Sequence, residues 1–127
     1  MPPLPVTWQK NSQNNEWFDF LRLDLDSSYF SLGKKGVFII WYTSPAGGRA
    51  IRVGSGVLAD QLKALRTNPS IVQYSTNGPL KVSWVAVNGV LQESQMAGAE
   101  AFLYDLYKPL VGEKNPAPPI NIGPLRK

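Results

Sequence analysis

The fold of this chain is decided by residues 36–56, "GVFIIWYTSPAGGRAIRVGSG". Six apolar or aromatic residues run from Val37 to Tyr42 and include several β-branched types, which predicts a strand covered on both faces. The stretch "SPAGGR" predicts a turn, and Ala50 to Val53 predicts a returning strand. The segment is therefore expected to form an antiparallel hairpin.

The elements after the hairpin follow from hydrophobic spacing. A helix is expected at once, because three leucines share one helical face: Leu58, Leu62 and Leu65. Asn68-Pro69 should end that helix. Residues 81–87 predict a third strand that is mostly apolar on both faces.

A last helix is expected from Met96 to Val111, where apolar residues recur at helical spacing, and Pro109 should end or kink it. The segment "WFDFLRLDLDS" from Trp17 fits a strand or a helix, and we interpret it as a strand. This order of elements predicts an α/β (α+β) domain with a small antiparallel or mixed three-stranded sheet flanked by helices.

The two ends are expected to lie outside this unit. Three prolines among the first five residues and a polar run after them predict a flexible N-terminal arm over residues 1–15. The stretch "PAPPINIGP" predicts an extended proline-rich tail over residues 116–127. One domain is therefore expected over residues 16–115.

Composition excludes several classes of function. The 127 residues contain no cysteine and no histidine, so disulfides, zinc fingers and histidine-based catalysis are excluded. The start lacks a basic region followed by an apolar core, and no apolar run approaches the roughly 18 residues that span a bilayer. A cytoplasmic protein without a membrane partner is expected.

Positive charge is concentrated in the middle of the chain. The net charge is +4, but residues 34–81 contain seven basic residues and one acid. The basic residues are Lys34, Lys35, Arg49, Arg52, Lys63, Arg66 and Lys81, and the acid is Asp60. Such an excess is typical of a phosphate-binding surface, and it is also compatible with an ordinary solvated surface.

Three further features are candidates for chemistry. Glu100 lies on the apolar stripe of the last expected helix, so a metal ion, an arginine or hydrogen-bond donors could accompany it, unless it reaches water at the edge of the stripe. The glycine turn Gly54-Ser55-Gly56 before a helix could hold a phosphate or simply turn the chain. Four aromatic residues near the basic region could stack bases, although packing is the commoner role: Trp41, Tyr42, Tyr74 and Trp84.

Together these features resemble the GIY-YIG nuclease superfamily over about residues 36 to 116. Gly36-Val37-Phe38 stands where Gly-Ile-Tyr would, Arg52-Val53-Gly54 stands where Tyr-Ile-Gly would, and Glu100 matches the glutamate of a later helix. The resemblance implies a phosphodiesterase in which that glutamate binds one divalent metal, while tyrosines and an arginine position water and stabilise the phosphate.

The departures from the motif bear on activity. Phe38 and Arg52 replace the two tyrosines, and Gln61 replaces the arginine. None of these side chains can perform the implied role, so we expect a domain that has lost nuclease chemistry and needs no cofactor. Arg52 is placed near the old site by the resemblance and is hypothesised to pair with Glu100.

Three functions remain open from the sequence. The first is binding of nucleic acid, DNA rather than RNA, through Arg49, Arg52, Lys63 and Arg66. The second is a divergent endonuclease that holds Mg²⁺ or Mn²⁺ at Glu100, with Tyr42 or another hydroxyl in place of the lost phenols. The third is a protein interaction module that uses the tail or exposed aromatics, with a protein partner or a homodimer.

Overall fold

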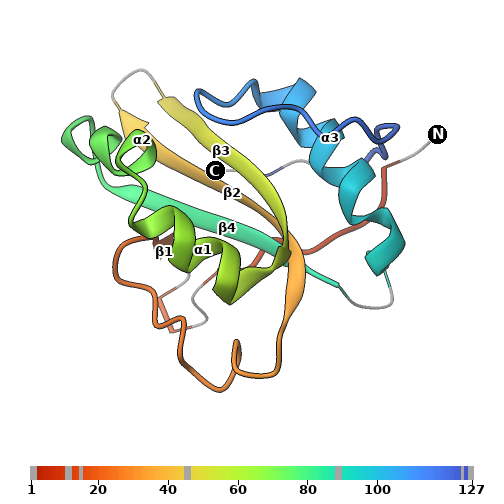
Figure 1. Ribbon diagram of the computed structural model, residues 1–127, viewed down its shortest axis with the longest axis horizontal. Helices are drawn as coiled ribbons and strands as arrows, with labels where there is room; N and C mark the ends of the chain where they lie inside the picture. Colours follow the sequence, from red (N-terminus) through yellow and green to blue (C-terminus); the bar gives the residue numbers. More distant parts are fainter. Residues whose placement is uncertain are drawn as a thin grey trace.

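The computed structural model describes residues 3–10, 13–14, 16–44, 47–87, 90–123 and 125. In this part of the chain an antiparallel sheet has the strand order β1–β4–β2–β3 (Figure 1). The strands are β1 (Phe18–Asp19), β2 (Lys35–Ser44), β3 (Gly47–Val57) and β4 (Leu80–Ala86). The helices are α1 (Leu58–Arg66), α2 (Pro69–Val72) and α3 (Met96–Tyr107), with 3-10 turns η1 (Gln73–Thr76) and η2 (Glu93–Gln95). The expected α+β class is confirmed, and the sheet has a fourth strand because Phe18 and Asp19, in the segment expected as a strand from Trp17, pair with β4.

The hairpin of β2 and β3 provides the centre and one edge of the sheet. Phe38 lies opposite Gly54, and Ile40 lies opposite Arg52. One extra residue, Ile51, forms a β-bulge, because Trp41 already pairs with Ala50. The expected turn falls at residues 45 and 46, which lie outside the described residues.

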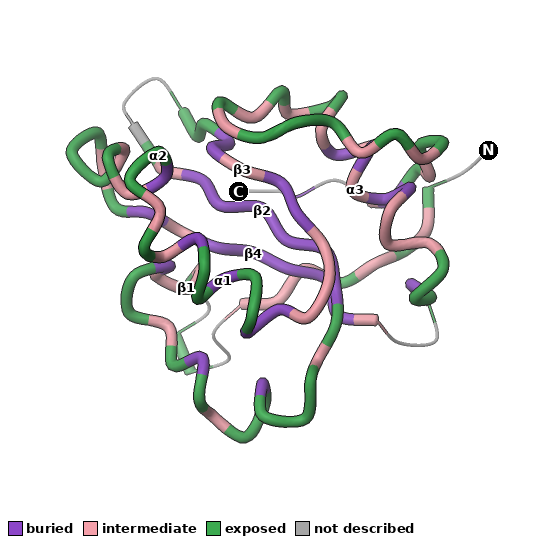
Figure 2. Tube along the Cα trace, in the orientation of Figure 1, coloured by how far each residue is buried: buried purple, intermediate pink, exposed green. Residues whose placement is uncertain are grey.

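The sheet separates two apolar cores, because successive residues of a strand point to opposite faces. Figure 2 shows that β2 and β4 are buried along most of their length. Phe38 and Ile40 belong to the cluster that also contains Leu58 and Leu62 of α1. Val37, Ile39 and Trp41 of the same strand belong to the cluster that contains Ala99 and Leu103 of α3. β2 is therefore buried on both faces, as its continuous apolar run predicts.

The last helix is shorter than expected. α3 ends at Tyr107, four residues before Val111. Lys108 follows in the left-handed conformation, with φ 47° and ψ 65°. The ring of Pro109 disfavours the right-handed α conformation at the residue before it, so the helix cannot continue through Lys108.

The strand expected from Trp17 onwards is wrong beyond Asp19. The backbone N–H groups of Arg22 and Leu23 both donate to the carbonyl of Asp19, which turns the chain away from β4. Farther on, the Asp24 carboxylate accepts from the N–H of Asp26. Such local side-chain hydrogen bonds compete with strand pairing.

Described residues near both ends, among them Leu4, Trp8, Ile122 and Leu125, pack onto the α3 side of the sheet, within stretches expected to form a loose arm and a tail. Leu4 forms a parallel bridge with Ile122, which is 0 % exposed. The indole N–H of Trp8 donates to the carbonyl of Gly123 at 2.9 Å. Tyr107 exchanges two hydrogen bonds with the backbone of Leu125. The core therefore extends on both sides of residues 16–115.

No helix in the described part of the chain is long and apolar enough to cross a membrane.

Candidate functional site

Glu100 contacts the exit of the hairpin. It lies half-buried on α3, and the hydroxyl of Ser55 donates to its Oε1 at 2.6 Å. The hydrogen bond joins two residues that are 45 positions apart in the chain. The sequence-based interpretation requires this proximity of the final helix to Gly54-Ser55-Gly56, and the structure contains it.

The hypothesised pair between Arg52 and Glu100 is wrong. Arg52 lies opposite Ile40 and so shares the face of α1, whereas Ser55 lies opposite Val37 on the face of α3. An odd separation along a strand places two side chains on opposite faces of the sheet. Among the described residues Glu100 has the Ser55 hydroxyl as its partner, and Arg52 forms no ion pair.

The other two family positions lie on the side of α1. Phe38 is 0 % exposed, and a Cβ at Gly54 would lie 2.4 Å from the Cζ of its ring. Gly54 is therefore where the Phe38 ring packs, which explains the glycine without a phosphate. Gln61 is exposed, and a Cβ at Gly56 would lie 3.4 Å from its Nε2. The four family positions lie near residues 52–56 of β3, but Glu100 lies on one face of the sheet and the other three on the opposite face. They therefore do not form one cleft.

Two observations concern the endonuclease interpretation built on Glu100. No group of three carboxylate, cysteine or histidine side chains suited to a metal ion occurs among the described residues. Ser55 pairs with Val37 of β2, and Tyr42 lies five positions farther along that strand. The distance along the strand between Val37 and Tyr42 is roughly 16 Å. This tyrosine also lies on the opposite face from Glu100 and cannot replace a lost phenol there.

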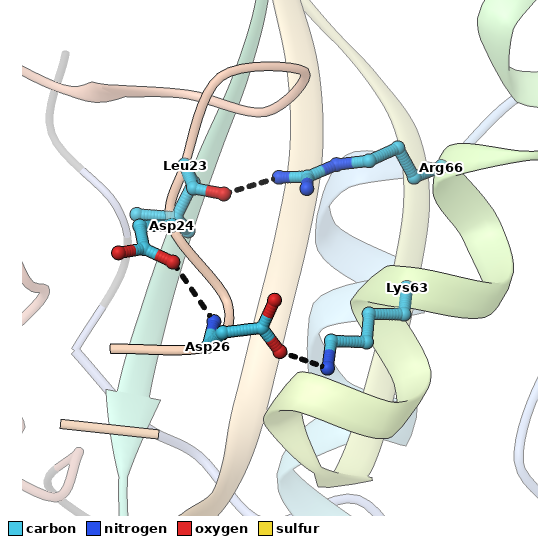
Figure 3. A network of polar contacts seen from close by, with 5 residues as sticks. All are labelled: Leu23, Asp24, Asp26, Lys63 and Arg66. Carbon is cyan, nitrogen blue, oxygen red and sulfur yellow. Dashed lines mark hydrogen bonds and ion pairs between the residues drawn. The ribbon is translucent and has the colours of Figure 1, made fainter. Parts of the chain in front are cut away.

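Two basic residues of α1 bind oxygen atoms of the segment before β2 (Figure 3). Lys63 forms an ion pair with Asp26 at 2.5 Å, and its hydrogen bond and charge hold the pKa of that carboxyl below its usual value. Nη2 of Arg66 donates to the carbonyl oxygens of Phe20 and Leu23, at 2.7 and 2.6 Å. The expected set of four phosphate-binding residues is therefore divided, and Arg66 in particular fixes the loop before β2.

Other basic residues of the middle region also have partners. Lys35 pairs with Glu93, and Lys81 pairs with Asp19 at 2.6 Å. The ammonium of Lys34 lies 4.7 Å from the ring centre of Tyr29. Much of the charge excess seen in the sequence is thus compensated by residues from outside the segment.

Arg49 and Arg52 are the exceptions. Arg49 is exposed, and its side chain makes no hydrogen bond or ion pair within the described part of the chain. The Nε of Arg52 is buried and has no hydrogen-bond partner among the described residues. Both arginines lie on β3, opposite Tyr42 and Ile40, so strand register places them on one face.

The segment after α3 determines the surroundings of Arg52. The N–H of Val111 donates to the carbonyl of Ile51, which pairs this segment with the outer edge of β3. Gly112 follows with φ +96°, and a Cβ there would lie 2.5 Å from Nη1 of Arg52. Glycine is favoured at 112 by this left-handed backbone conformation, whereas the Arg52 guanidinium is the end of a flexible side chain that could shift.

Comparison with family models, with curated proteins and with solved structures found no match to this chain.

Proposed function

We propose that this chain is a GIY-YIG-like domain that binds nucleic acid through the arginines of β3 and has lost nuclease chemistry. The observation that carries the proposal is that Arg49 and Arg52, on one face of an edge strand, form no ion pair with any described residue. Phosphate contacts supply most of the affinity of sequence-independent nucleic-acid binding, and a guanidinium suits a phosphate because it donates in a planar fork.

The arrangement of elements supports the GIY-YIG part of the proposal. A hairpin leads directly into α1, and a later helix brings Glu100 against the hairpin exit through Ser55. The order of hairpin, helix, strand and helix is the one that the resemblance implies.

The identity of the residues supports the loss of catalysis. Phe38 can neither donate nor accept a proton, and its ring is buried in the core. Arg52 and Glu100 lie on opposite faces of β3. Removing one positioned acid–base group typically lowers a rate by about 10²–10⁴, so several such losses leave little of the original reaction.

Fluorescence anisotropy with labelled DNA tests the binding. We expect the affinity for a 20-base-pair duplex or a 20-nucleotide strand to fall roughly tenfold between 50 and 200 mM salt, as two phosphate contacts require. An affinity that does not change with salt would contradict the proposal.

Incubation of the same DNA with the protein and Mg²⁺ or Mn²⁺ tests the loss of catalysis. We expect the DNA to stay intact. Cleavage that disappears in Glu100→Ala would instead support the endonuclease interpretation, and binding at Arg49 and Arg52 would then serve a nuclease.

A further inference from the structure

Two tyrosines stand apart from the other aromatic residues of the basic region. Trp41 and Trp84 are 2 % and 3 % exposed and belong to the cores. Tyr42 of β2 and Tyr74 of η1 are only half-buried, and their rings lie nearly parallel, at 8° with 6.2 Å between centres. Neither hydroxyl makes a hydrogen bond within the described part of the chain, whereas buried tyrosine hydroxyls usually have a partner.

Strand register brings the two free arginines to this pair. Arg49 lies directly opposite Tyr42, and Arg52 lies opposite Ile40, two residues away on the same face. The bulge makes this possible, because it turns the consecutive residues Ile51 and Arg52 to one face, where Ile51 fills the core. Strand register therefore places Tyr42, Arg49 and Arg52 on one face of the sheet, and the ring of Tyr74 lies parallel to that of Tyr42.

We propose that the surface formed by Tyr42, Tyr74, Arg49 and Arg52 binds a single-stranded nucleic acid, with bases stacked on the tyrosines and phosphates on the arginines. This inference rests on the proposed function and names its substrate class. Proteins that hold single strands combine stacking rings with a basic track along the backbone.

A single strand fits this surface better than a duplex does. The faces of bases inside a duplex are already covered by their neighbours, so only unpaired bases can lie against a ring. An extended proline-rich peptide could also contact two aromatic rings, but its neutral chain would gain nothing from Arg49 and Arg52. The charge of the surface therefore favours a polyanion.

Titration with 15-nucleotide strands that contain 2-aminopurine tests the inference, because stacking on an aromatic ring changes the fluorescence of that base. We expect the double variant Tyr42→Leu/Tyr74→Leu to bind single strands at least fivefold more weakly and to lose the fluorescence change, with duplex affinity altered less than twofold. The control variant Tyr42→Phe/Tyr74→Phe keeps both rings and should keep both signals.

Tyr74→Ala provides a second variant in case the double change disturbs the core, since Tyr74 lies on the short turn η1 and outside the sheet. Tyr74 packs against the core, so the melting temperature should fall, but the variant should stay folded by circular dichroism and bind single strands at least fivefold more weakly. DNA and RNA strands of the same sequence, compared in parallel, show whether the 2′-hydroxyl contributes.

The outcomes separate the inference from the proposed function. Equal affinity for duplex and single strand, unchanged in the leucine variant, would overturn the stacking surface and leave nucleic-acid binding intact. A proline–alanine peptide that binds with tyrosine-dependent affinity, while single strands do not, would also overturn it. If neither strand nor duplex binds, the proposed function fails as well.

Discussion

Substitution of Gly54 by alanine should destabilise the protein through a clash with one ring. The new Cβ would lie 2.4 Å from Cζ and 2.8 Å from Cε1 of Phe38. Phe38 is 0 % exposed, so its ring cannot yield without moving its neighbours. Overpacking of this kind lowers the free energy of unfolding by about 1–3 kcal/mol. For a chain of this size each kcal/mol lowers the melting temperature by roughly 3–5 °C.

A double-mutant cycle measured by thermal or urea unfolding isolates this contact. Phe38→Leu removes the ring atoms that the alanine would meet and by itself costs roughly 1–2 kcal/mol. The combined variant should lose at least about 1 kcal/mol less than the sum of the two single changes. Gly123→Ala is the matched control, since its Cβ would be no closer than 3.5 Å to any neighbour, and it should change stability by less than about 1 kcal/mol.

Two results would contradict the packing of the Phe38 ring against Gly54. One is a Gly54→Ala variant as stable as the wild type. The other is an additive cycle, in which the effects at Gly54 and Phe38 sum within about 0.5 kcal/mol. Either result would mean that the glycine does not serve to seat the ring, and a role in binding a ligand would return.

Three further substitutions test other contacts. Ser55→Ala removes the donor to Glu100 and should lower the free energy of unfolding by about 0.5–1.5 kcal/mol in urea titrations, with Ser55→Thr less harmful. Asp26→Asn should lower the melting temperature near pH 6, in the pH range above the ordinary carboxyl pKa of 3.8, and should have no effect once the pH falls below the lowered pKa that Lys63 imposes. Tyr107→Phe removes both hydrogen bonds to the C-terminal tail and should speed proteolysis of the tail, whereas unchanged cleavage would contradict its packed state.

Hydrophobic pattern was enough to predict the central elements. The apolar run from Val37 to Tyr42 can be buried only in the middle of a sheet, and the leucine stripe of α1 only against the face of one. Local sequence and tertiary packing therefore agree. The segment after Trp17 misled because its alternating leucines suit a strand, while the Asp24 carboxylate accepts from the nearby backbone N–H of Asp26. The tail misled because proline content excludes a ladder or a helix but does not prevent single residues such as Ile122 from filling a core.

The candidate site depends on information that the sequence does not display. Glu100 was singled out because a carboxylate on an apolar stripe is unusual, but the partner hypothesised from the resemblance was Arg52, whereas the structure shows Ser55. The pairing of Lys63 with Asp26 and the use of Arg66 on carbonyl oxygens depend on a loop far away in the sequence. Arg49 and Arg52 lie on the same face because of the bulge at Ile51. Without that extra residue the two side chains would point to opposite faces.

Binding of phosphates by the arginines of β3 is best tested by the salt dependence of single-strand binding in two variants of equal net charge. Arg49→Ala/Arg52→Ala removes the free arginines, and Lys35→Ala/Lys63→Ala removes two lysines that form ion pairs. If the arginines of β3 bind phosphates, the arginine variant should reduce the slope of log K against log salt by about 1.4, at roughly 0.7 per phosphate contact, while the lysine variant should change it by less than about 0.5. Equal slopes in the two variants would contradict binding at the arginines of β3.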